Sequence, residues 1–222
     1  MSFQTGAVRG VIFDMDGLMV DTEPLAARAW HEVLAAYGRT LDDALYHRMV
    51  GHRTLESARM VLAAVDLPLT ADELAARKTA RFAEIRARGV PPMPGLFDVV
   101  AALARRGLPW GVATSSPRQH AVEILAQLNL TAACRAIAAG DEVRHGKPAP
   151  DVYALAAARL GVPPAACLAL EDSAPGCRAA QAAGMRVVAV PNGATETADF
   201  SFVPAVYPSL HDVAAQLDRL LQ

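Results

Sequence analysis

Several residue types are scarce in this sequence, and each scarcity excludes a class of protein. Aromatic residues make up only 5% of the 222 residues, while 53% are hydrophobic and much of that share is alanine. This composition favours many helices over a β-sandwich. The three cysteines, Cys134, Cys167 and Cys177, have no Cys-x-x-Cys spacing. We interpret them as small core residues in a reducing compartment rather than as a disulfide framework.

Long runs of like-charged residues and long apolar runs are also missing. The 21 basic and 23 acidic side chains are mixed along the chain and give a net charge of −2, with no basic block. We therefore expect no nucleic-acid partner and no membrane partner. No stretch approaches the ~18 continuous apolar residues of a spanning helix, and residues 1–10 lack the apolar core of a signal peptide. The expectation is a cytoplasmic monomer.

Hydrophobic periodicity divides the chain into two regions with different patterns. Residues 23–90 read as helices only, with expected helices at 25–37, 41–49, 55–65 and 71–88. From residue 91 onward, short apolar runs alternate with helices of about ten residues, which is typical of repeated βαβ units. We predict an α/β fold with a Rossmann-like parallel sheet, formed by residues 1–22 and 91–222. An all-helical segment, residues 23–90, is inserted after the first strand.

Polar side chains follow the predicted strands at the points where they end. Asp14 and Asp16 come directly after the apolar run at 11–13, and two carboxylates so close together need a proton or a cation between them. Ligands of parallel sheets bind at the carboxyl ends of the strands. Carboxylate oxygens suit Mg²⁺, whereas hydroxyls, amides and a lysine suit phosphate oxygens. The other candidates at strand ends are Thr114, Ser115, Lys147, Glu171 and Asp172.

Four separated motifs carry a resemblance to a known family. They are Asp14-x-Asp16-Gly-x-x-x-Asp21-Thr-Glu, Val112-Ala-Thr-Ser115, Gly146-Lys147-Pro-x-Pro-Asp151 and Glu171-Asp172-Ser-x-x-Gly176. In this order they resemble the haloacid dehalogenase superfamily, in its β-phosphoglucomutase and phosphatase branch with a helical cap. The sequence is most similar there to pseudouridine 5′-phosphatase-like and sugar-phosphate phosphatases. The resemblance covers nearly the whole chain.

The resemblance implies a role for each matching residue. Asp14 would be the nucleophile that forms an aspartyl-phosphate, and Asp16 would be the general acid and base. Asp14, the backbone carbonyl of Asp16, and Asp172 would bind Mg²⁺. Glu171 would either join these ligands or support them through a hydrogen bond. The phosphoryl oxygens would be held by Thr114, by the Ser115 amide and by Lys147.

The reaction class is left open between three readings. A Mg²⁺-dependent phosphatase acting on a small sugar or nucleotide monophosphate is favoured, because residues 23–30 lack the histidine that mutases of this branch carry there. A phosphosugar mutase of the β-phosphoglucomutase type is the alternative. A catalytically idle, Mg²⁺-responsive binding module is the third reading. We expect His52 and Arg53 in the helical segment to contact the substrate.

Overall fold

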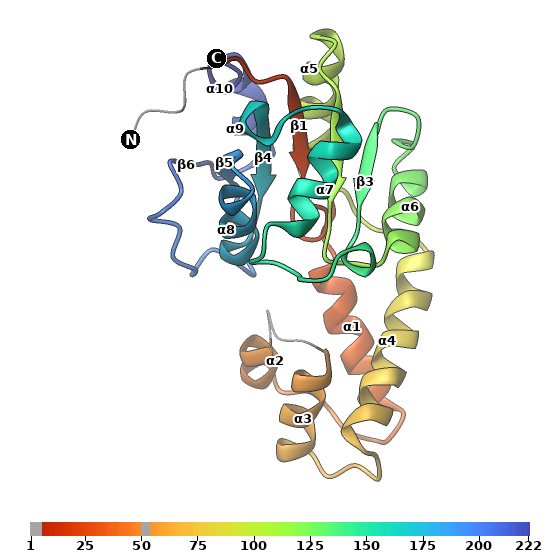
Figure 1. The fold of residues 1–222 in the computed structure, drawn as a ribbon. Helices are drawn as coiled ribbons and strands as arrows, with labels where there is room; N and C mark the ends of the chain where they lie inside the picture. Colours follow the sequence, from red (N-terminus) through yellow and green to blue (C-terminus); the bar gives the residue numbers. More distant parts are fainter. Residues whose placement is uncertain (1–5, 50–53) are drawn as a thin grey trace. The chain divides into compact units, whose positions relative to one another are not determined.

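The computed structural model describes residues 6–49 and 54–222, and the chain separates into two compact units (Figure 1). One unit contains Met1–Asp21 and Pro91–Gln222, and the other contains Thr22–Val90. The first unit is built on a parallel sheet, whereas the described residues of the second form helices joined by loops. The helical unit is an insertion that follows the first strand of the sheet.

The sheet has six strands in the order β3-β2-β1-β4-β5-β6, and every neighbouring pair is parallel. β1, which the first motif follows directly, lies near the middle between β2 and β4. The predicted α/β fold is therefore confirmed. The strands are β1 (Gly10–Phe13), β2 (Trp110–Ala113), β3 (Ala136–Ala138), β4 (Cys167–Glu171), β5 (Arg186–Ala189) and β6 (Ala205–Val206).

The central strands are apolar because helices cover them. Val11, Ile12 and Phe13 of β1 are fully buried, which explains why they form a continuous apolar run rather than an alternating one. Figure 1 shows α7 and α8 crossing one face of the sheet. The helices of this unit are α5 (Leu96–Arg105), α6 (Arg118–Gln127), α7 (Asp151–Leu160), α8 (Ala174–Ala182), α9 (Leu210–Ala215) and α10 (Leu217–Leu220).

The helical unit has its own core. Trp30, Leu34, Val61 and Leu74 are buried together, each contributed by one of three helices. Thr70 forms a capping box with Glu73, in which each side chain accepts from the other's backbone N–H, so α4 has a defined start. The helices are α1 (Glu23–Ala35), α2 (Asp43–Met49), α3 (Thr54–Ala64) and α4 (Ala71–Ala87).

The end of the chain differs from what its apolar pattern indicates. That pattern predicts a single amphipathic helix over 210–221, but the helix is broken at Gln216, whose φ of −103° and ψ of 7° are not helical. The apolar spacing continues through the break, so periodicity alone does not reveal it. The short strand β6 was also missed, because two residues are too few to show an alternating pattern.

Candidate active site at the carboxyl edge of the sheet

Strand register places the motif residues at one level. Phe13 pairs with Val112 of β2 and with Leu170 of β4, so the residues that follow these positions leave the sheet together. The backbone N–H of Asp14 continues the ladder by donating to the Leu170 carbonyl at 2.9 Å. The carboxyl ends of three adjacent strands thus bring Asp14, Thr114 and Glu171 to the same edge, within the sheet unit.

Lys147 lies between two carboxylates. Its Nζ is 2.5 Å from Asp14 Oδ1 and 2.6 Å from Glu171 Oε1, and it also donates to the Ala113 carbonyl at 3.2 Å. All three ammonium protons therefore have acceptors. Burial opposes the charge on Lys147, but the carboxylates of Asp14 and Glu171 outweigh it, so the pKa of Lys147 is raised and the side chain stays cationic.

Glu171 accepts hydrogen bonds on both oxygens although its side chain is fully buried. Oε1 accepts from Lys147 and from the Tyr153 hydroxyl at 3.0 Å, while Oε2 accepts from the Ser173 amide and hydroxyl, each at 2.9 Å. Gly176 packs so closely against this carboxylate that a Cβ would overlap it, which accounts for the glycine in the fourth motif. Four donors hold Glu171 in one orientation.

Negative charge exceeds positive charge in this buried space. Carboxylate oxygens of Asp14, Glu171 and Asp172 lie within 4.8 Å of one another, and one lysine faces these three acids. Burial raises the pKa of Asp14 to about 7, where the Lys147 charge opposes the shift and the Glu171 and Asp16 carboxylates add to it. Burial, with Asp14 and Glu171, raises the pKa of Asp172 to about 9. A buried all-oxygen donor set with this charge excess fits a hard divalent cation.

Asp172 is oriented by a residue that sequence reasoning missed. Asn192 donates from Nδ2 to Asp172 Oδ2 at 2.9 Å and to the Gly17 carbonyl at 2.8 Å, while its Oδ1 accepts from the Ala194 amide. Gly17 has a φ of +88° and no room for a Cβ beside Asp172. Asn192 thereby connects the turn after β1 to the acid that follows β4.

Asp16 is held from the loop after β2. Its Oδ2 accepts from Thr114 Oγ1 at 3.2 Å and from Ser116 Oγ at 2.8 Å. Thr114 Oγ1 in turn accepts from the Ser116 amide at 3.0 Å. The place of Ser116 directly before Pro117 predicts a helix cap, but α6 begins after Pro117 without a side-chain cap, and the serine hydroxyl donates to Asp16 instead. The Ser115 side chain is exposed.

The structure brings together six of the nine residues predicted from the sequence: Asp14, Asp16, Thr114, Lys147, Glu171 and Asp172. Ser115 follows Thr114 in the same loop and is exposed. His52 and Arg53, predicted to contact the substrate, lie outside the described residues. Tyr153, Ser116 and Asn192 were missed as members of the site. The sequence did contain a signal for Tyr153. The tyrosine lies two residues after the Lys147-containing motif, in the first turn of α7, which packs on the sheet (Figure 1). Asn192 follows a strand, as the predicted site residues do.

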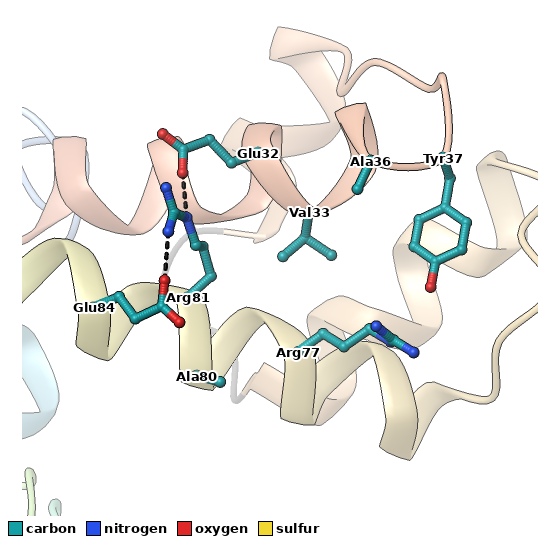
Figure 2. Close-up of a pocket in the computed structure, with 8 residues that line it drawn as sticks. All are labelled: Glu32, Val33, Ala36, Tyr37, Arg77, Ala80, Arg81 and Glu84. Carbon is teal, nitrogen blue, oxygen red and sulfur yellow. Dashed lines mark hydrogen bonds and ion pairs between the residues drawn. The ribbon is translucent and has the colours of Figure 1, made fainter.

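A separate hollow lies within the helical unit (Figure 2). It has a volume of about 290 Å³ between α1 and α4 and is lined by Val33, Ala36 and Tyr37. At one end Arg81 forms ion pairs with Glu32 and Glu84, a group that we call the helix ion cluster. The hollow contains none of the motif residues.

Among the described residues, no helix is long and apolar enough to cross a membrane.

Comparison with known proteins gives consistent results. The pattern of the haloacid dehalogenase-like hydrolases matches residues 8–184. The chain is 40% identical over 181 residues to the fructose-1-phosphate phosphatase YqaB of Escherichia coli (strain K12), covering 82% of this chain and 95% of that protein. It is 36% identical over 212 residues to a probable pseudouridine-5′-phosphatase of Drosophila melanogaster, covering 90% and 89%. A crystal structure of CbbY from Rhodobacter sphaeroides in complex with phosphate matches with a TM-score of 0.79 and 31% identity, covering 95% and 99%.

The fold and the site together define a parallel α/β enzyme with a buried acidic centre and an inserted helical segment. The chain belongs to the haloacid dehalogenase-like hydrolases, in the branch that contains β-phosphoglucomutase, CbbY and their phosphatase relatives. Within that family it is a phosphoric monoester hydrolase. The buried acidic triad Asp14, Glu171 and Asp172 is typical of the family's metal site.

Proposed function

We propose that this protein is a Mg²⁺-dependent phosphatase that hydrolyses a small phosphorylated sugar through an aspartyl-phosphate on Asp14. The observation that carries the proposal is the placement of Asp14 at the end of the central strand, with Lys147 against its Oδ1 at 2.5 Å. A carboxylate attacks an anionic phosphate only when positive charge offsets their repulsion. The lysine supplies part of that charge.

Mg²⁺ would be held by Asp14, by Asp172 and by the backbone carbonyl of Asp16. When bound, it supplies positive charge that neutralises the phosphoryl oxygens during transfer. The excess of buried carboxylates over Lys147 supports this assignment, because all three acids cannot ionise around one ammonium group without a further cation.

The remaining roles belong to side chains of this chain. Asp14 attacks phosphorus, and the bond to the leaving oxygen breaks as that oxygen takes a proton from Asp16. Asp16 then accepts a proton from water, whose oxygen attacks phosphorus and releases phosphate from Asp14. Lys147, with Thr114 and the Ser115 amide, would hold the phosphoryl oxygens.

The substrate class follows from the relatives. A relative at 40% identity is named for fructose 1-phosphate, and one at 36% for pseudouridine 5′-phosphate, both small sugar-containing monoesters. We favour a hexose monophosphate, because the identity to the fructose-1-phosphate phosphatase is higher over a similar share of the chain. The helical segment, residues 23–90, would act as the cap that selects the sugar.

The test measures phosphate release from a panel of sugar and nucleotide monophosphates, with Mg²⁺ and with EDTA. We expect Mg²⁺-dependent turnover, highest with hexose monophosphates, and a loss of about 1,000-fold or more in Asp14→Asn. Residual activity within about tenfold of the parent, near 1.4 kcal/mol in barrier, would show that Asp14 is not the nucleophile.

A mutase remains the alternative outcome of that test. Supplying β-glucose 1-phosphate with a trace of glucose 1,6-bisphosphate distinguishes the two reactions. Glucose 6-phosphate appearing faster than free phosphate would overturn hydrolysis as the main reaction. The absence of turnover on every substrate, with Asp14 intact and Mg²⁺ present, would instead indicate a binding module.

A further inference from the structure

We propose that Ser116 is a positioning residue for proton transfer: with Thr114 it fixes one carboxylate oxygen of Asp16 and leaves the other oxygen to carry the proton. The proposal rests on the function proposed above, in which Asp16 is the general acid and base. It concerns how the chain aims that acid, and it assigns a role to a serine hydroxyl that the motif resemblance leaves without one.

The geometry is asymmetric between the two oxygens of Asp16. Oδ2 accepts two hydroxyl hydrogen bonds, from Ser116 at 2.8 Å and from Thr114 at 3.2 Å. Among the described residues, Oδ1 has no hydrogen-bond partner. The three side chains come from the loops after β1 and β2, so the sheet register itself brings them together. Thr114 is fully buried, which gives the arrangement a rigid base.

The direction of both hydrogen bonds is fixed while Asp16 is ionised, because a carboxylate oxygen can only accept. A hydroxyl group has one proton to donate. Thr114 Oγ1 accepts the backbone N–H of Ser116 at 3.0 Å, and its own proton is therefore available for Asp16 Oδ2. An Asp16 proton on Oδ2 would compete with both hydroxyl donors. When Asp16 is protonated, its proton consequently lies on Oδ1.

This assignment gives the chemical step a defined atom. As Asp14 bonds to phosphorus, the electron pair of the breaking phosphorus–oxygen bond moves to the leaving oxygen, which takes the proton from Asp16 Oδ1. In the second step Oδ1 accepts a proton from the attacking water. Ser116 keeps its hydrogen bond to Oδ2 throughout, so the carboxyl group does not have to rotate between steps, while the Thr114 proton turns from Oδ2 to a phosphoryl oxygen when the substrate binds.

The hydroxyl of Ser116 can be removed without disturbing the other hydrogen bonds of this arrangement. Ser116→Ala deletes one hydroxyl but keeps the backbone N–H that orients Thr114. The carboxyl group of Asp16 is then held by one longer bond and can turn about its last side-chain torsion. Because proton donation depends on the orientation of the acid, we expect a loss in kcat/KM that becomes larger for substrates with poorer leaving groups.

The experiment compares kcat/KM over substituted phenyl phosphates and benzyl phosphate, with Mg²⁺ saturating. This parameter covers the steps up to release of the first product, so it includes proton donation to the leaving oxygen and excludes hydrolysis of the aspartyl-phosphate. We expect Ser116→Ala to be within about threefold of the parent on 4-nitrophenyl phosphate, whose leaving group needs little acid, and reduced about 10-fold or more on benzyl phosphate. Ser116→Thr should restore the parent pattern.

A double-variant cycle separates positioning from phosphate binding. On an Asp16→Asn background, Ser116→Ala should cause no further loss on benzyl phosphate, because the acid that it positions is gone. An equal loss on all substrates, or an additional loss on that background, would overturn the proposal and indicate direct phosphate contact. A loss confined to sugar phosphates would overturn it too and indicate contact with the sugar. Failure of the proposed function looks different: Asp14→Asn would keep its activity.

Discussion

The molecule places one cation between two carboxylates in two regions, with opposite results. In the core ion cluster, Lys147 bridges Asp14 and Glu171; in the helix ion cluster, Arg81 bridges Glu32 and Glu84. The side chains of the first are at most 8% exposed, whereas those of the second are 29% to 61% exposed. Arg28 also pairs with Glu32, so the two clusters share a cation that bridges two carboxylates, and burial is the main difference between them.

The two clusters differ in the direction in which the pKa of a paired carboxylate is shifted. The hydrogen bonds from Arg28 and Arg81 lower the pKa of Glu32, as expected for an acid that is solvated and paired. Figure 2 shows the pair with Arg81. Asp14 has an equally direct cationic partner, yet burial raises its pKa to about 7. Desolvation of a carboxylate that shares its space with two other acids outweighs one lysine.

The contrast shows where the protein gives up stability for chemistry. The core ion cluster retains a destabilised carboxylate, Asp14, beside the loops of the candidate site, whereas Tyr153 and Ser173 donate hydrogen bonds to its neighbour Glu171. Groups whose pKa is strongly shifted by burial and by specific partners cluster at functional sites. In the helix ion cluster the pKa of Glu32 is lowered rather than raised, and we assign the cluster no catalytic role.

Removing the buried cation should have the largest effect on folding. Lys147→Met leaves Asp14 and Glu171 buried without a counter-charge, and we expect a loss of about 3–5 kcal/mol in the free energy of unfolding. Urea denaturation at pH 8 in EDTA measures it. Arg81→Met is the matched control, since it makes the same kind of substitution at the centre of the helix ion cluster. A loss below about 1 kcal/mol in Lys147→Met would mean that the carboxylates are solvated.

Removing the buried carboxylate should have a smaller effect of opposite sign. The pKa of Asp14 is raised in the folded state, so its contribution favours folding at low pH and is lost as pH rises from about 4 to about 7. Asp14→Asn cannot ionise and avoids this loss. We expect the variant to be more stable than the parent by about 1–2 kcal/mol at pH 8 in EDTA, after allowing for a weaker bond to Lys147.

The same comparison at pH 5 provides the control for Asp14→Asn. The advantage of the variant should shrink there, because the parent carboxyl is then largely protonated in the folded state. Added Mg²⁺ at pH 8 should stabilise the parent more than the variant. A variant that is less stable than the parent at pH 8 without metal would show that Lys147 outweighs burial, contrary to the comparison above.

The sequence was sufficient for the fold and for the residues that meet at the sheet edge. Continuous apolar runs such as Val11–Phe13 indicate strands buried on both faces, and a parallel sheet then brings together whatever follows them. The parts that could not be predicted depend on side-chain direction. Nothing in the sequence states that Ser116 turns toward Asp16 or that Asn192 reaches Asp172, because those contacts join loops 100 and 20 residues apart.

The smallest effect is expected in the helix ion cluster. Arg81→Met removes two half-exposed ion pairs, and such pairs contribute little because water solvates the separated charges nearly as well. We expect the Tm of the protein to change by no more than about 2 °C, and the change to vanish in 1 M NaCl, where exposed charges are screened. Thermal unfolding at low and high salt measures both. A decrease as large as that of Lys147→Met, or one that salt does not reduce, would show that something other than burial separates the two clusters.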